Sequence, residues 1–76
     1  MTDYFSKHFT AMPQQIQKAF GKQLGLLLSN PKHPSLRAKI VDPEKRLWQA
    51  RVTQGYRFYY SMEHDLLTLH EIKAHD

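Results

Sequence analysis

The chain has 76 residues, of which 41% are hydrophobic and 12% aromatic, and it contains no cysteine. A chain of this length predicts a single domain over residues 1–76, with a small core and no disulfide framework. Lys and Arg exceed Asp and Glu by 11 to 7, and the net charge of +4 favours a polyanionic partner. The longest apolar run, LGLLL, excludes a membrane-spanning helix, and no signal peptide is recognisable, so we expect a cytoplasmic protein.

The first predicted element is a helix near the N-terminus, which either Thr2 or Asp3 is expected to cap. Phe5 and Phe9 lie four residues apart and therefore share one face of this helix. Pro13 is expected to end it, because a proline suits the first turn of the next helix but not a helix interior.

The second predicted helix runs over residues 13–29 and is amphipathic. Its apolar side chains recur at helical spacing: Ile16, Phe20, Leu24, Leu27 and Leu28. Gly21 and Gly25 lie on one side of it, and we expect the backbone of the first helix to approach closely there. Asn30, which precedes Pro31, is expected to end the helix in a left-handed conformation.

Four strands are predicted after a stiff corner that Pro31 and Pro34 bracket. The strands are expected over 35–41, 46–53, 56–62 and 66–74, the first three with alternating apolar and polar residues. The last strand begins apolar on both faces, which makes it a candidate for a central position. Short turns connect the strands and predict an antiparallel meander. The expected fold is α+β: an N-terminal helical hairpin packed on one face of a small antiparallel sheet of three to four strands.

The two faces of the predicted sheet differ in chemistry. Trp48, Phe58 and Tyr60 fall on the face that meets the helices and are expected to be buried. The other face and its connections carry the cations of segment 37–57: Arg37, Lys39, Lys45, Arg46, Arg51 and Arg57. Guanidinium groups bind phosphates and aromatic rings stack on bases, so this face is predicted to bind RNA. Its candidate RNA-binding residues are Arg37, Lys45, Arg46 and Tyr59.

Four segments, taken in order and spacing, resemble the RelE/ParE superfamily of toxins from bacterial toxin–antitoxin pairs. They are FSKHFTAMPQQIQKA, NPKHPSLRAK, LWQARVTQGYRFYY and LHEIKAHD, so the resemblance runs from about Phe5 to Asp76. It implies a toxin that inhibits growth and that a cognate antitoxin neutralises. Many members cleave mRNA on the ribosome, whereas members of the ParE type poison DNA gyrase. The function expected here is a metal-independent endoribonuclease without a cofactor, which inhibits translation.

The resemblance also assigns roles to individual residues. It places Arg57 at the scissile phosphate and Arg51 beside it as a second cation. Lys39 matches a lysine on the first strand of cleaving members. His75 matches a basic or histidine residue that often follows the last strand. Many members also have a strand before the first helix and a tyrosine at the C-terminal end, and this sequence has neither.

Cleavage of RNA by its own 2′-hydroxyl needs a base for that hydroxyl, positive charge at the phosphate and an acid for the 5′-oxygen. Arg57 and Arg51 suit the second role and His75 the third. Lys39 would serve as the base if neighbouring cations lower its pKa. Two alternatives to cleavage stay open: gyrase-type binding without cleavage, and an inactive member that only binds an antitoxin. The histidine spacing predicts no metal site.

Overall fold

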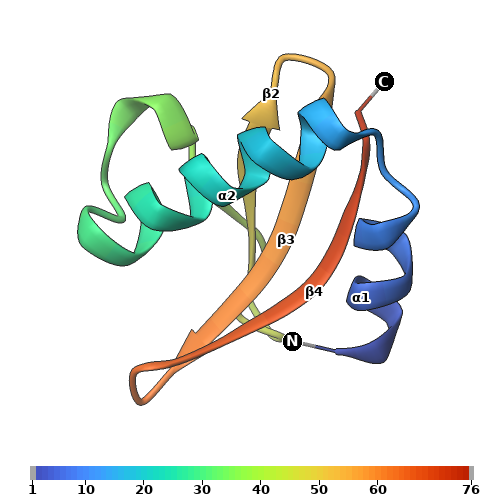
Figure 1. Cartoon of the computed structure of the whole chain (residues 1–76). Coiled ribbons are helices and arrows are strands. Elements are labelled where there is room, and N and C mark those ends of the chain that lie inside the picture. Colours follow the sequence, from blue (N-terminus) through green and yellow to red (C-terminus); the bar gives the residue numbers. More distant parts are fainter. Residues whose placement is uncertain (1, 76) are drawn as a thin grey trace.

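The computed structural model describes residues 2–75 and has two layers, with helices on one face of a sheet (Figure 1). Its elements are α1 (Asp3–Thr10), α2 (Gln14–Ser29), a 3₁₀ helix η1 (Pro34–Leu36), β1 (Lys39–Asp42), β2 (Leu47–Thr53), β3 (Tyr56–Glu63) and β4 (Leu66–Ala74). The four strands pair in the order β1-β2-β3-β4, each antiparallel to the next. The predicted α+β meander is therefore confirmed. No helix within residues 2–75 is long and apolar enough to cross a membrane.

Local signals explain where the two helices begin. The Thr2 hydroxyl accepts a hydrogen bond from the Phe5 N–H at 3.0 Å, so Thr2 rather than Asp3 is the N-cap of α1. Pro13 lies just before α2 with φ −55°, a value that its ring imposes and that leads directly into a helix. Helix α1 then packs against β4, and α2 packs against β2.

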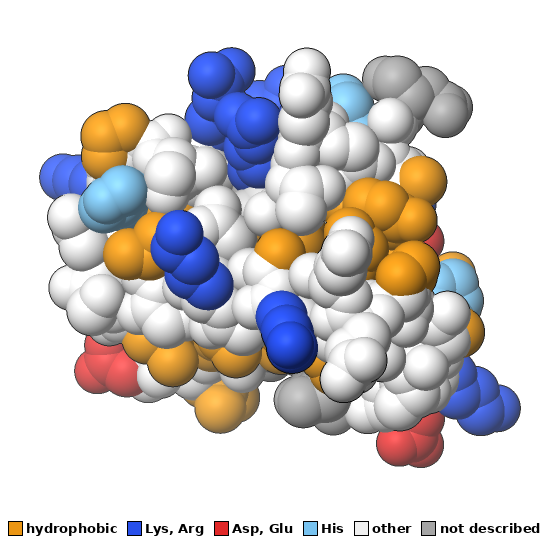
Figure 2. All heavy atoms as spheres, turned by 45° about the horizontal axis from the view of Figure 1, so that its top comes forward, with side chains coloured by type: hydrophobic (Ala, Val, Ile, Leu, Met, Phe, Trp, Pro, Cys, Tyr) orange, Lys and Arg blue, Asp and Glu red, His pale blue; other side chains and the backbone are white. Residues whose placement is uncertain are grey.

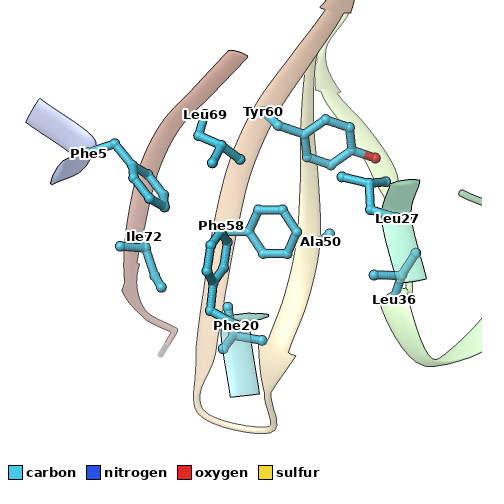
Figure 3. Packing of buried hydrophobic residues seen from close by; sticks show 10 residues of the cluster. Phe5, Phe20, Leu27, Leu36, Ala50, Phe58, Tyr60, Leu69 and Ile72 are labelled. Carbon is cyan, nitrogen blue, oxygen red and sulfur yellow. The ribbon is translucent and has the colours of Figure 1, made fainter. Parts of the chain in front are cut away.

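Aromatic rings join the two layers at the centre of the core. The ring of Phe20 meets that of Phe58 on β3 edge-on, with centroids 5.0 Å apart, and also contacts Phe5 and Phe9 of α1. Figure 3 shows Phe5, Phe20 and Phe58 among the buried side chains that pack on the sheet. The fully or nearly buried hydrophobic residues are Phe5, Phe20, Leu27, Leu36, Ala50, Val52, Phe58, Tyr60, Leu69 and Ile72. Each large side chain among them contributes about 1.5–3 kcal/mol through burial.

Three predictions about α2 are wrong. Gly21 and Gly25 are exposed, and a Cβ at either would meet no atom within 4 Å, so no backbone approaches them. Asn30 has φ −152°, which is extended rather than left-handed, and its N–H donates to the Leu26 carbonyl. Leu28 is 64% exposed, because the helix presents a neighbouring face, with Phe20 and Leu27, to the sheet.

Gln23 is the buried polar residue on that face of α2. Its Nε2 donates to the carbonyl oxygens of Ser35 at 3.1 Å and Arg51 at 2.8 Å. One side chain thereby ties α2 to η1 and to β2, and a buried amide is stable there because its donors are satisfied.

The corner folds more tightly than predicted, and the first strand starts later. The His33 ring nitrogen Nδ1 accepts from the Ser35 N–H, which caps η1, and Pro34 opens that helix. Arg37 then adopts a left-handed conformation with φ 47°. This reversal interrupts the predicted alternation, so Leu36 is fully buried whereas Ile40, on the short edge strand β1, is 45% exposed.

Two further predictions about the sheet are corrected. Trp48 is 37% exposed, because α2 crosses the sheet nearer the β2–β3 turn and leaves the Trp48 end of β2 uncovered (Figure 1). Its ring still stacks on that of Tyr60, with centroids 6.4 Å apart. Strand β4 is an edge strand and not a central one, since it pairs only with β3. Leu69 and Ile72 of β4 are buried on the side where α1 packs, whereas Leu66 at its start is 68% exposed.

Candidate nucleic-acid interface

Basic side chains from three strands share the sheet face that the helices leave open. The antiparallel register places Arg57 on β3 directly between Arg51 on β2 and Lys73 on β4. The neighbouring row contains Lys39, Gln49, Tyr59 and Glu71. Side chains directly opposite each other in such rows are about 4.5–5.5 Å apart at Cβ, so three cations lie side by side.

Next to these rows is a cavity of about 220 Å³, which we call the cationic pocket; it is lined by Arg37, Lys39, Gln49, Arg57 and His75. Three of the four predicted catalytic residues therefore meet in one place, together with Arg37. A volume equal to roughly seven waters, at ~30 Å³ each, accommodates a phosphate group with its solvent. Figure 2 shows Lys and Arg side chains gathered beside a histidine at its upper edge.

Gln49 forms the least exposed part of the pocket and was missed by the sequence analysis. It is only 7% exposed, although it lies on the face away from the helices. The structure gives its side-chain amide no hydrogen-bond partner within residues 2–75, and none of their fully buried N or O atoms lacks a partner. The amide must therefore reach solvent, and it does so at the pocket. Strand alternation placed Gln49 on this face, but only the surrounding side chains reveal that it is nearly buried.

Arg57 is held in place by the turn next to it. Its Nη1 donates to the carbonyl oxygens of Thr53 at 2.6 Å, Gln54 at 3.2 Å and Tyr56 at 3.0 Å. These bonds orient the guanidinium at the edge of the pocket and also close the β2–β3 turn. The side chain predicted to hold the scissile phosphate thus has a structural role as well.

His75 is anchored through its backbone rather than frayed. Its N–H donates to the Gly55 carbonyl oxygen at 2.8 Å, which extends the β-type pairing one step beyond β4. The exposed His75 lines the pocket together with Lys39 and Arg37. A histidine at this position is able to exchange a proton with a group bound in the pocket.

Arg37 enters the pocket from the corner and not from a strand. Its left-handed backbone, φ 47° and ψ 41°, costs a non-glycine residue roughly 1–2 kcal/mol and is retained where the surroundings dictate it. Here its N–H donates to the Pro34 carbonyl and ends η1. The backbone conformation of the corner therefore places the Arg37 guanidinium at the sheet face.

The remaining predicted residues lie outside the pocket. Arg51 is adjacent to Arg57 but does not line the cavity. Lys45 and Arg46 are exposed in the β1–β2 turn, beyond Leu47 at the far end of β2. Tyr59 lies beside the pocket, and the ammonium of Lys73 is 5.3 Å from its ring centroid. Lys73 was not predicted, since the apolar start of its strand left the facing of β4 undecided.

Within residues 2–75 no three His, Asp or Glu side chains cluster in a way that could hold a metal ion. No protein-family model and no curated protein matches the chain.

Proposed function

We propose that this protein is the toxin of a type II toxin–antitoxin pair, similar to the RelE/ParE superfamily, and that it cleaves mRNA on the ribosome in the cytoplasm. A cognate antitoxin protein would neutralise it. The observation that carries the proposal is the cationic pocket, where Arg37, Lys39, Arg57 and His75 converge from the corner, two strands and the residue after β4.

The pocket contains the groups that cleavage by the 2′-hydroxyl needs. Arg57 and Arg37 hold the scissile phosphate, and guanidinium groups bind its oxygens in pairs. Lys39, when deprotonated, takes the proton of the 2′-hydroxyl as the 2′-oxygen attacks phosphorus. His75, when protonated, gives a proton to the 5′-oxygen as its bond to phosphorus breaks. The products are a 2′,3′-cyclic phosphate and a free 5′-hydroxyl, so bonds and protons balance. Arg51, which lies beside Arg57 and outside the cavity, contacts the next phosphate.

One observation favours the alternative of binding without cleavage. The Nη1 of Arg57 already makes three hydrogen bonds to backbone carbonyls. A guanidinium that is partly engaged within the protein has fewer donors for a developing phosphate charge. The alternative function is a gyrase-type binding inhibitor, or an inactive member that only binds an antitoxin.

The test is induced expression followed by primer extension on a reporter mRNA, and then single-turnover cleavage by purified variants. We expect growth arrest and cuts at regular positions within translated codons. His75→Ala should lower the cleavage rate by at least about tenfold, toward the ~10²–10⁴-fold typical of general acids, with RNA affinity nearly unchanged. His75→Lys should restore part of the rate if charge alone matters.

His64→Asn is the matched control, because His64 lies in the β3–β4 turn, far from the pocket, with a positive φ of 49° that asparagine tolerates. It should cleave at the parental rate. Growth arrest without any cut in the mRNA would reject the nuclease and leave the binding inhibitor. Parental cleavage by His75→Ala would remove His75 from the mechanism.

A further inference from the structure

Two nearly buried glutamines, Gln23 and Gln49, differ in their hydrogen bonding. Each is 7% exposed. The amide of Gln23 donates to two backbone carbonyls, whereas that of Gln49 has no hydrogen-bond partner within residues 2–75. Buried polar groups in folded proteins are normally hydrogen-bonded. The Gln49 amide is therefore available to a molecule that enters the cationic pocket, which Gln49 lines.

The lining of the cationic pocket combines charged groups with this neutral amide. Arg37, Lys39 and Arg57 supply positive charge, and Gln49 supplies the acceptor Oε1 and the N–H donors of Nε2. A phosphodiester accepts hydrogen bonds but donates none, so it leaves Oε1 without a partner. An oxygen that loses its solvent and gains no donor destabilises the complex. The complete lining therefore fits a ligand that carries an anion and, beside it, a hydrogen-bond donor.

A nucleotide of single-stranded RNA has both parts. Its phosphate suits the guanidinium groups, and its unpaired base exposes edges that side chains read by hydrogen bonds. Tyr59, which is half-buried, lies directly opposite Gln49 on β3. Such a pair is about 4.5–5.5 Å apart at Cβ, and tyrosine rings stack on bases. The antiparallel register thus places a stacking ring next to the free amide.

Adenine matches the amide best among the four bases. It presents the N6–H donor next to the N7 acceptor, and glutamine pairs with this edge through two hydrogen bonds. Guanine presents two acceptors there, O6 and N7, so one of them would face Oε1. Uracil offers only the O4 acceptor on that side. Cytosine offers a donor beside an acceptor, N4–H and N3, but has a smaller ring to stack on Tyr59.

We infer that Gln49 reads an adenine base next to the phosphate in the cationic pocket, by donating from Nε2 to N7 and accepting at Oε1 from N6–H. The base stacks on Tyr59. The inference rests on the proposed function, since it takes RNA as the ligand, and it adds a base preference. Gln49 is then a specificity-determining residue and takes no part in the proton transfers assigned to Lys39 and His75.

Short RNAs test the inference on the unaltered protein. Labelled strands of five nucleotides are uracil throughout or carry adenine, guanine, cytosine or 7-deazaadenine at the centre, and 2′-fluoro groups prevent cleavage. Fluorescence anisotropy at low salt measures the affinities. We expect the adenine strand to bind about fivefold or more tighter than the guanine, cytosine and uracil strands. The 7-deazaadenine strand keeps N6–H but lacks N7, so it should bind about threefold or more weaker than the adenine strand.

Variants assign the preference to one side chain. Gln49→Met keeps the length of the side chain and removes the amide, so its affinity for the adenine strand should fall to about that for the uracil strand. Gln49→Glu accepts from N6–H but cannot donate to N7, so it should bind the adenine and 7-deazaadenine strands equally. Gln15→Met is the matched control, because Gln15 is exposed on α2, and it should keep the parental preference. Circular dichroism checks that each variant is folded.

Each result bears on a separate claim. Equal affinity of the parent for all strands, or an unchanged preference in Gln49→Met, would overturn the reading of a base by Gln49. A preference for another base that Gln49→Met abolishes would overturn the assignment to adenine. A parent that binds none of the strands would overturn the inference, whereas regular cuts in translated mRNA would still support the proposed function. A preference for adenine that depends on Gln49, without any cut in mRNA, would keep the inference and reject the nuclease.

Discussion

Arg57 lines the cationic pocket and also closes the hairpin beside it, because its Nη1 is bonded to three backbone carbonyls. Gln49 combines near-complete burial with access to the same pocket. At the scale of single residues, the interface is thus built from side chains whose structural and binding roles overlap. Substitutions there must be judged by stability as well as by activity.

Arg57→Ala is expected to lower the free energy of unfolding as well as RNA affinity. Hydrogen bonds from a charged group contribute about 1.5–3 kcal/mol when buried, and the partial exposure of Arg57 reduces this to about 1–2 kcal/mol. Urea unfolding measures it, with Arg51→Ala as the control at the adjacent position, where we expect a change within about 0.5 kcal/mol. Equal stability of the two variants would mean that the turn does not depend on Arg57.

Tyr60 should make the protein less stable at alkaline pH. Burial raises the pKa of the Tyr60 phenol above its usual value of 10.0. Because the folded-state pKa lies above the unfolded one, this contribution is fully present below about pH 10 and is lost as pH rises through the folded pKa. Thermal unfolding from neutral pH to above pH 10 should show a steeper loss for the parent than for Tyr60→Phe. Parallel curves for the two proteins would contradict the assignment to Tyr60.

At the scale of elements, two glycines in α2 make the protein less stable than alanines would at the same positions. Gly21 and Gly25 are exposed, lie in the helix interior and leave open space where a Cβ would be. Glycine there weakens the helix by roughly 0.5–1 kcal/mol relative to alanine, mainly through backbone entropy.

Gly21→Ala and Gly25→Ala should therefore each raise the free energy of unfolding by roughly 0.5–1 kcal/mol, and the double variant by about the sum. Denaturant unfolding is the measurement. The control is Gly55→Ala in the β2–β3 turn, outside any helix, where the gain should be smaller. A loss of stability in either helix variant would show that a backbone does approach α2 on that side.

At the scale of the whole molecule, the net charge of +4 is distributed unevenly. The open sheet face carries Lys39, Arg51, Arg57 and Lys73, and the helix side carries a cavity of about 570 Å³ whose walls include Leu27, Trp48 and Met62. The sheet thereby separates a basic surface from a largely apolar one. Among residues 2–75, Arg37 alone lines both cavities.

RNA binding should be strongly dependent on salt. Each phosphate contact of a single strand changes the slope of log affinity against log salt by about −0.7, so contacts from about four cations predict a slope near −3. Fluorescence anisotropy with labelled single-stranded RNA measures it, and Arg51→Ala should reduce the slope by about 0.7. Lys18→Ala, on the exposed side of α2, should leave it unchanged. Equal slopes for the parent and Arg51→Ala would place the RNA elsewhere.

The sequence predicts correctly those features that depend on residues close together in the chain. A cap at Thr2 or Asp3, the break at Pro13 and the alternation of Phe58 and Tyr60 predicted elements that the structure confirms, with Thr2 as the cap. Three of the four residues proposed for catalysis, Lys39, Arg57 and His75, line one cavity. Whether they act on RNA stays a prediction, and the experiments above decide it.

The sequence by itself determined the order of the elements and the facing of β2 and β3, because caps, turns and period-two alternation act between near neighbours. Only the tertiary structure decided which apolar residues are covered. Trp48 remains exposed because α2 crosses the sheet nearer the β2–β3 turn, and Ile40 because it lies on the short edge strand β1 after the reversal at Arg37. The tertiary structure also decided that Arg37 and His75 line one pocket. Their meeting depends on the left-handed backbone at Arg37 and on the pairing of His75 with Gly55, and no local sequence pattern predicts either.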